Sequence, residues 1–217
     1  MKFTNLEEYL FSSYNVKGYL SDFSLYNKNS IIIKLHEETI NKNEIPKDTN
    51  ILEFEPIVLA LYPNKILSNN QDIETDKLLL LDGHHRWKYA NQIESIHKLK
   101  CILVNFEDIQ IKSYNFKLNL DIQNFDNFLL DSGFDKTENT KVGIKFKNTF
   151  YSSPNHDHIL ELYKFKKILQ DNETIIPILD DSVENTNLIS FSPISPEDLL
   201  NITELLPPKS TWITPRI

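Results

Sequence analysis

The sequence predicts an α/β (α+β) protein built from two lobes, and three observations lead to this prediction. Up to about residue 106, short apolar runs typical of strands alternate with a helical segment. One of these runs, Leu78–Leu81, stops abruptly at Asp82-Gly83 and is followed by residues that favour helix. Beyond about Asp108, amphipathic helical patterns and short strand patterns replace this alternation. We therefore expect a lobe boundary near residue 110.

The first lobe is expected to span residues 30–110, behind an N-terminal helical appendage at residues 1–29. Within that appendage, residues 6–13 fit a short amphipathic helix. The lobe itself should contain strands at Ser30–Leu35, Pro56–Tyr62, Leu78–Leu81 and Leu99–Phe106, and a helix at Arg86–Gln92. The segment Lys65–Asp76 is polar and turn-like, which predicts that the strands on either side of it form a hairpin.

The second lobe, residues 111–217, is expected to be a smaller α+β unit. Residues 109–118 alternate loosely and fit a strand that bridges the two lobes. Apolar residues recur at helical spacing over 122–132, where Gly133 is the stop signal, and over 158–169. A last helix should begin with Pro196 in its first turn. Short strands are expected at 142–146, 150–151, 175–179 and 188–191.

Composition excludes several classes of protein. A hydrophobic content of 40% with 13 Phe argues against general disorder. The net charge of −8 argues against tight nonspecific binding to nucleic acid or anionic lipid. The single cysteine, Cys101, sits in an apolar run and fits a reducing cytosol. We expect a cytoplasmic protein, because Glu7 and Glu8 do not suit a signal peptide and no apolar run approaches the roughly 18 residues of a membrane span.

The segment 82–87, Asp-Gly-His-His-Arg-Trp, carries the densest polar chemistry in the chain. A strand that breaks at Gly83 and opens a helix directs backbone N–H groups to one point, where proteins tend to hold phosphate or carboxylate. Arg86 adds a cation, the histidines add a candidate base, and Asp82 adds a carboxylate that can face a metal. Alternatively, Asp82 and His84 only cap the helix. We favour a functional role, because capping needs only one such polar residue and this turn has four. The four glycines of the chain cannot form a GxGxxG or GxxxxGK[ST] loop.

Three other groups of residues are candidates for a role in a site or in the core. Lys209, Ser210 and Thr211 supply one cation and two hydroxyls, which suit phosphate oxygens. The segment 156–158, His-Asp-His, has the composition of a metal site, but adjacent residues rarely face one ion, so we interpret it as the entry to a helix. The aromatic side chains of the helical patterns are interpreted as core: Phe125, Phe128 and Phe165.

The segment 82–87 resembles the DGHHR signature of the free L-serine kinases, which belong to the ParB/sulfiredoxin-like superfamily. Four further segments resemble parts of those kinases: His36-Glu37 their His-Glu pair, in which the Glu is the catalytic base, 55–60 their Pro-led strand, 107–114 the segment after the signature strand, and 208–211 their terminal Pro-Lys-Thr-Thr loop. The family loop continues with Arg-His, whereas this chain has Trp212-Ile213. In this respect, residues 207–211 are closer to a related bacterial DGHHR family of obscure function that ends in a PPKST loop.

The resemblance implies a ParB/sulfiredoxin-like N-terminal lobe and an active site in the cleft between the lobes, to which the last ten residues return. It implies a kinase that transfers a phosphoryl group from ATP or ADP to the hydroxyl of a small metabolite, with free L-serine favoured. The implied roles are catalysis for Glu37 and Asp82, nucleotide or phosphate binding for Gly83, His84, His85, Arg86, Lys209, Ser210 and Thr211, substrate binding for His36, Trp87 and Tyr114, and Mg²⁺ binding for Asp82. Glu38 and Glu44 compete with Glu37 for the role of base.

Two other functions fit parts of the sequence. A ParB-like nucleotide-dependent DNA-binding or partition module shares the turn at 82–87, but it needs a basic helix-turn-helix region after the nucleotide domain. Residues 111–217 contain no basic stretch, so neither a nucleic-acid nor a membrane partner is expected. A nucleotide-sensing regulatory protein without turnover is the third candidate, and nucleotide binding without an acceptor-dependent product would indicate it.

Overall fold

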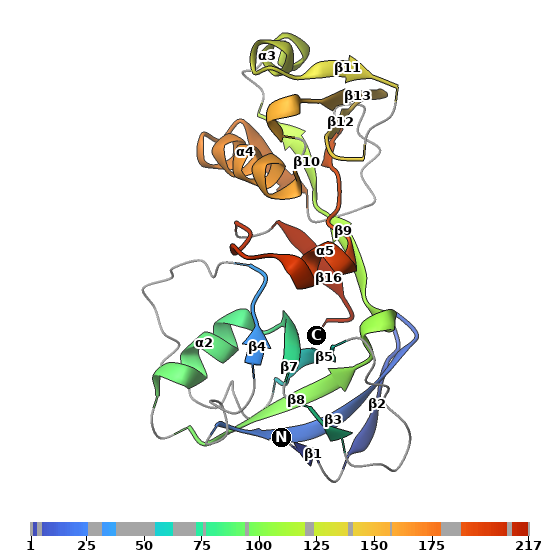
Figure 1. Cartoon of the computed structure of the whole chain (residues 1–217), viewed down its shortest axis with the longest axis vertical. Helices are drawn as coiled ribbons and strands as arrows, with labels where there is room; N and C mark the ends of the chain where they lie inside the picture. The colour runs from blue at the N-terminus through green and yellow to red at the C-terminus, as the bar shows by residue number, and fades with distance from the viewer. Residues whose placement is uncertain are drawn as a thin grey trace. The chain divides into compact units, whose positions relative to one another are not determined.

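The computed structural model describes residues 2–3, 6–25, 32–37, 55–62, 73–75, 77–93, 96–119, 124–138, 141–156, 158–178, 188–207 and 210–216. The chain forms two compact units. The first comprises Met1–Gln110, Leu200–Thr203 and Ile213–Ile217, and the second comprises Ile111–Leu199 and Glu204–Trp212. Both units contain strands and helices, which confirms the α+β class (Figure 1).

The first unit is built on a six-stranded sheet of order β2-β3-β8-β5-β7-β4. Its strands are β2 (Glu7–Phe11), β3 (Val16–Ser24), β4 (Ile32–Lys34), β5 (Ile57–Leu61), β7 (Lys77–Asp82) and β8 (Lys98–Val104). The pairs β4–β7 and β5–β8 are parallel, and the other neighbours are antiparallel. The antiparallel pairing of β5 with β7 confirms the predicted partnership of the strands that flank the polar segment. A separate two-stranded sheet pairs β1 (Lys2–Phe3) with β6 (Ile73–Glu74).

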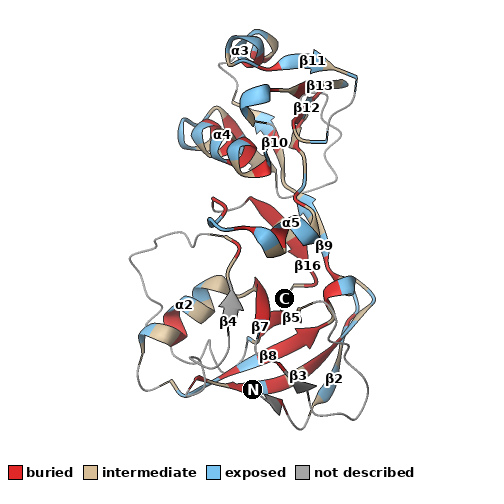
Figure 2. Cartoon of the chain, viewed as in Figure 1, coloured by how far each residue is buried: buried red, intermediate tan, exposed pale blue. Residues whose placement is uncertain are grey.

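The centre of this sheet is the core of the first unit. All five residues of β5 and the four leucines of β7 are buried, as expected for continuous apolar runs that are covered on both faces (Figure 2). Helix α2 (His84–Gln92) packs on the same core through Tyr89 and Ala90. Cys101 lies there too, and burial raises the pKa of its thiol, which fits the predicted role of a small hydrophobe.

The predicted N-terminal helical appendage is wrong. Residues 7–11 form β2, which pairs antiparallel with β3 from Glu7 opposite Leu20 to Phe11 opposite Val16. The apolar residues of this segment fit helical spacing and a strand almost equally well, so partner contacts decide between the two. The partner, β3, lies next along the chain and continues the sheet to β8. The first unit therefore includes the N-terminal strands and does not begin at residue 30.

The second unit contains an antiparallel six-stranded sheet of order β11-β13-β12-β15-β10-β14. Its strands are β10 (Asn115–Leu118), β11 (Asp135–Thr137), β12 (Ile144–Phe146), β13 (Thr149–Ser152), β14 (Ile175–Ile178) and β15 (Leu188–Phe191). The other helices of the chain are α3 (Phe125–Asp131), α4 (Ile159–Asp171) and α5 (Pro196–Asn201), and there are 3-10 turns at Phe106–Asp108, in the first unit, and Pro154–His156. A further strand pair joins β9 (Gln110–Ser113) to β16 (Thr211–Thr214). The single strand predicted at 109–118 is therefore two strands, β9 and β10.

The helices α3, α4 and α5 confirm the three helical predictions for this half of the chain. His158 caps α4 by accepting from the Leu160 N–H at 3.3 Å, which confirms that this segment is a helix entry; Asp157 lies outside the described residues. Phe125 is buried, whereas Phe128 is 36% exposed, so its assignment to the core is wrong. Its ring lies at the margin, stacked on Phe125. In the described part of the chain, no helix is long and apolar enough to cross a bilayer.

Candidate functional site

Polar residues gather at one edge of the sheet in the first unit. Strands β4 and β7 are parallel, so their carboxyl ends lie at the same edge, and the antiparallel β5 begins there. Glu37 follows β4, Glu55 precedes β5, and Asp82 closes β7, where its register partner is Val58 of β5. The topology therefore brings three acidic residues that are far apart in the sequence to one edge of the sheet.

Gly83 makes the turn from β7 into α2 and lets backbone approach the guanidinium of Arg86. Its φ of +89° lies in the left-handed region that favours glycine. A Cβ at this position would lie 2.7 Å from Ile57 Cγ2 and 3.1 Å from both Nε and Nη2 of Arg86. Gly83 is also the N-cap of α2, and a glycine has no side chain with which to cap the helix. The N-cap residue is therefore neither Asp82 nor His84, and the helix start suits an anion.

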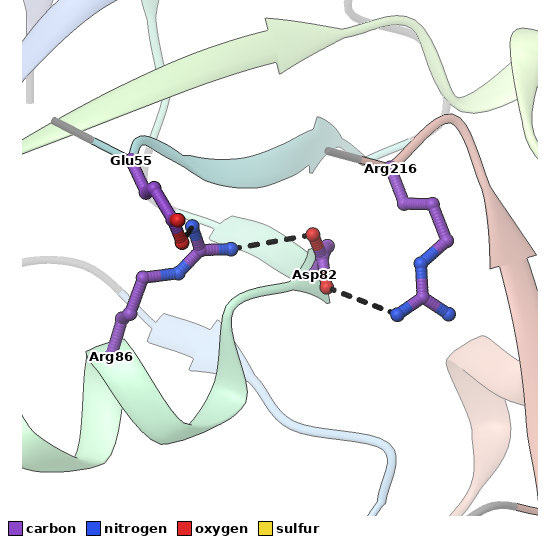
Figure 3. A network of polar contacts seen from close by, with 4 residues as sticks. All are labelled: Glu55, Asp82, Arg86 and Arg216. Atoms are coloured by element: carbon purple, nitrogen blue, oxygen red, sulfur yellow. Dashed lines mark hydrogen bonds and ion pairs between the residues drawn. The ribbon is translucent and has the colours of Figure 1, made fainter. Parts of the chain in front are cut away.

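Four charged side chains of alternating sign form a chain of contacts beside this turn (Figure 3). Arg86 donates from Nη1 to Oε2 of Glu55 at 2.9 Å and from Nη2 to Oδ2 of Asp82 at 3.3 Å. Nη2 of Arg216 lies 3.9 Å from the other oxygen of Asp82. The side chains of Arg86 and Asp82 are 14% and 16% exposed, whereas that of Glu55 is 61% exposed. Asp82 thus lies between two guanidinium groups, and one of these is held against the turn.

Two histidines near this end of the sheet, His36 and His84, contact each other. His36 is buried, and its Nδ1 lies 2.9 Å from the carbonyl oxygen of Leu80. A carbonyl only accepts, so Nδ1 carries the proton and donates. Burial, together with His84, lowers the pKa of His36 well below its ordinary value. The two imidazoles meet edge to face, with ring centroids 4.5 Å apart.

His84 is also neutral near pH 7. Burial lowers its pKa to about 4, against the opposing effect of the Asp82 carboxylate. Its Nε2 is buried and makes no hydrogen bond to any part of the chain that the structure describes. His84 therefore contributes hydrogen-bonding capacity to this edge of the sheet and no positive charge, so the cations here are Arg86 and Arg216.

Three more of the predicted site residues belong to the described part of the chain, namely Trp87, Tyr114 and His85. Trp87 packs on the core of the first unit, with its ring edge-on to Phe23 at 5.6 Å. Tyr114 belongs to the second unit, where its ring meets that of Trp212 at 5.3 Å. His85 is exposed in the first turn of α2. Lys209, like Glu38 and Glu44, lies outside the described residues.

Ser210 and Thr211 are buried in the second unit. The carbonyl of Ser210 accepts a hydrogen bond from Nζ of Lys166 at 2.9 Å. The hydroxyl of Ser210 is buried and has no hydrogen-bond partner within the described ranges. Both residues are therefore buried, and the Ser210 hydroxyl could still accept or donate a hydrogen bond.

Sequence reasoning missed Glu55 and Arg216 as members of the charged group. Glu55 was recognised only as the start of a strand, and Arg216 was not singled out. The signal for both is long-range, because each is defined by a partner on another element. A lone charged residue after or before an apolar run is usually solvated, so the local sequence offers no sign of such a contact.

The acidic residues of this edge fit a magnesium ion that arrives with phosphates. Across the described ranges, no cluster of three or more His, Cys, Asp or Glu residues could hold a metal. Mg²⁺ in phosphoryl-transfer sites usually takes one or two carboxylates and several phosphate oxygens or waters. Asp82 supplies one carboxylate at the turn into α2 and so meets that requirement.

Comparisons with known proteins show the fold. No protein-family model matches the chain, and no curated protein sequence matches it. Solved structures that resemble it, each at 14% identity over 90% of this chain, include SbnI with a C-terminal truncation from Staphylococcus aureus (TM-score 0.58, 82% of that chain), a free serine kinase in complex with AMP (0.55, 87%) and a conserved hypothetical protein from Pyrococcus furiosus (0.51, 90%). The chain therefore shares the fold of these structures, and the predicted likeness to the fold of the free serine kinases is confirmed.

Proposed function

We propose that this protein is a nucleotide-dependent kinase that transfers a phosphoryl group from ATP or ADP to the hydroxyl of a small metabolite, most favourably free L-serine to give O-phosphoserine. The observation that carries the proposal is the turn at Gly83, where a helix whose N-cap is a glycine begins against the guanidinium of Arg86. Solved free serine kinases of the same fold hold AMP or ADP, which supports a nucleotide as the ligand.

The donor phosphates would be held by the first turn of α2 and by Arg86. Phosphoryl transfer requires mainly positioning and neutralisation of phosphate charge. The backbone at Gly83 supplies close approach, and His84 and His85 supply hydrogen-bond donors. Mg²⁺ bound to the phosphates, with Asp82 near it, would supply the remaining positive charge. Lys209, Ser210 and Thr211 are proposed as further phosphate ligands.

The acceptor hydroxyl would be deprotonated by Glu37. This residue follows β4 at the edge of the sheet where Asp82 closes β7, so a carboxylate lies on the same edge as the phosphate turn. A general base must accept the hydroxyl proton as the oxygen attacks phosphorus in line with the leaving group. The buried His36, fixed to the carbonyl of Leu80, would hold the segment that carries Glu37. A role for Tyr114 or Trp87 in acceptor binding stays a prediction.

The activity is tested by incubating the protein with Mg²⁺, ATP or ADP and a panel of free amino acids and small alcohols, followed by phosphorus NMR. We expect a phosphomonoester signal that depends on the acceptor and is strongest with L-serine. Binding of nucleotide without a product from any acceptor would contradict the kinase and indicate a regulatory protein. A DNA mobility shift at moderate salt would indicate the partition module instead.

The role of Glu37 is tested by Glu37→Gln. The amide cannot take the proton, so turnover should fall by roughly 10²–10⁴-fold while nucleotide affinity is retained. Glu38→Gln is the neighbouring control and should turn over like the wild type. If the Glu38 variant loses activity and the Glu37 variant retains it, the base is misassigned by one residue.

A further inference from the structure

Arg216 follows strand β16, and its guanidinium lies near the carboxylate of Asp82. The residues that precede Arg216 are buried: Ile213 is 3% exposed, Thr214 is 6% exposed, and Pro215 is buried as well. Oγ1 of Thr214 lies 3.5 Å from the carbonyl oxygen of Gln110 and donates to it. All of these residues belong to the first unit. The backbone that carries Arg216 is therefore fixed beside the polar edge of the sheet.

The contact between Arg216 and Asp82 contributes little to stability. The two atoms are 3.9 Å apart, beyond hydrogen-bond length, and the side chain of Arg216 is 33% exposed. Partly exposed ion pairs of this kind contribute little free energy. Asp82 already accepts a closer hydrogen bond from Arg86. Stability thus gives no reason to bring a second guanidinium to this carboxylate.

Guanidinium groups and carboxylates alternate along this chain of contacts. Two guanidinium groups lie on opposite sides of one carboxylate, and the other carboxylate, that of Glu55, pairs with Arg86 on the side away from Arg216 (Figure 3). A planar guanidinium that is held near, but not tightly on, its counter-ion can exchange that contact for shorter bonds to phosphate oxygens.

We propose that Arg216 binds the outer phosphate of the donor nucleotide, while Arg86 and the first turn of α2 bind the inner one. This inference rests on the proposed kinase function and adds a residue to its site. Asp82, placed between the two guanidinium groups, orients both of them before the nucleotide arrives. The dependence on Arg216 should therefore grow with the number of phosphates on the ligand.

The test is calorimetric titration of AMP, ADP and ATP, with Mg²⁺ present, into the wild type and Arg216→Ala. Loss of one charge-assisted contact to phosphate should weaken binding by roughly tenfold or more. We expect AMP affinity within about twofold of the wild type, and losses of about tenfold for ADP and at least that for ATP. The ADP and ATP affinities of Arg216→Lys should fall between those of the wild type and Arg216→Ala, because a lysine keeps the charge without the planar fork.

Lys98→Ala is the matched control, because Lys98 is an exposed cation of the same unit that lies 3.8 Å from Asp22. It should bind all three nucleotides like the wild type. Equal weakening for AMP, ADP and ATP in the Arg216 variants would show that Arg216 only positions Asp82, and unchanged affinities would show that it has no part in binding; either result overturns the inference alone. A wild-type protein that binds none of the three overturns the proposed function as well.

Discussion

Arg86 in the first unit and Lys166 in the second show two ways of holding a cation. The side chain of Arg86 is 14% exposed, and it contacts the carboxylates of Glu55 and Asp82. Lys166 is fully buried. Its Nζ donates to a backbone carbonyl at 2.9 Å and lies over three aromatic rings, those of Phe116 at 4.9 Å, Tyr163 at 4.7 Å and Phe191 at 5.4 Å from the centroids.

The difference concerns what can replace each set of contacts. A buried charge is tolerated only where fixed groups compensate for lost water, and the faces of aromatic rings carry the negative potential that an ammonium needs. The rings around Lys166 belong to the core, so its contacts are permanent and tie α4 to the segment at Ser210. Arg86 pairs with carboxylates at a sheet edge, one of them largely exposed, so a phosphate can take their place. Lys166 therefore serves structure, whereas Arg86 suits ligand binding.

The largest effect is expected from removing the buried cation. Lys166→Ala should lower the free energy of unfolding by about 3–5 kcal/mol, because it leaves a cavity among three rings and a buried carbonyl at Ser210 without its donor. The measurement is urea denaturation followed by tryptophan fluorescence.

Two variants make this comparison specific. Lys166→Met keeps most of the side-chain volume and loses the donor, so we expect a smaller destabilisation of about 1–3 kcal/mol. Arg86→Ala should destabilise less than Lys166→Ala and weaken nucleotide binding at least tenfold. The distinction between the two cations fails if Lys166→Ala unfolds like the wild type, or if Arg86→Ala is folded and binds nucleotide normally.

A second effect on stability, intermediate in size, is expected when the pH is lowered. Burial keeps His36 neutral in the folded protein, whereas an unfolded chain protonates histidine below a pKa of about 6.5. As pH falls below that value, the unfolded state binds a proton that the folded state does not, so stability is full above about pH 6.5 and is lost toward the lower folded pKa. His36→Asn removes this titration and keeps a donor for the Leu80 carbonyl.

Between pH 7 and pH 5, the wild type should lose up to about 2 kcal/mol more than His36→Asn. Urea midpoints at pH 7, 6 and 5 measure this difference. Parallel losses in the two proteins would mean that His36 is protonated in the folded protein, as Lys166 is.

Much of the fold could be predicted because its central strands are continuous apolar runs. β5 and the four leucines of β7 are unbroken aliphatic segments, and β8 ends in the apolar run Cys101–Val104. β2 could not be predicted, because its five residues acquire strand geometry only by pairing with β3. Phe128 fits a helical apolar stripe, but it lies at the edge of that stripe and is partly exposed.

The candidate site also combines residues that the sequence could reveal with residues that it could not. Asp82, Gly83, His84 and Arg86 are adjacent in the sequence, so their chemistry was visible as one motif. The partners of that motif were not visible, because Glu55 reaches Arg86 through the pairing of β5 with β7 and Arg216 arrives on the last strand. A single sequence shows which residues can bind a ligand more readily than which residues hold them in place.

The smallest effect, and the closest test of exchangeable contacts, is expected from Glu55→Gln. Glu55 is 61% exposed, so its pair with Arg86 should contribute no more than about 1 kcal/mol to stability. Phosphate would no longer compete with a carboxylate for Arg86, so ATP should bind about two- to fivefold more tightly at low salt. Glu8→Gln is the control, because Glu8 is similarly exposed and pairs with Lys17 at 3.2 Å in the same unit; it should change neither quantity. Weaker ATP binding by Glu55→Gln would mean that Glu55 positions Arg86, and the contacts of Arg86 would then be as permanent as those of Lys166.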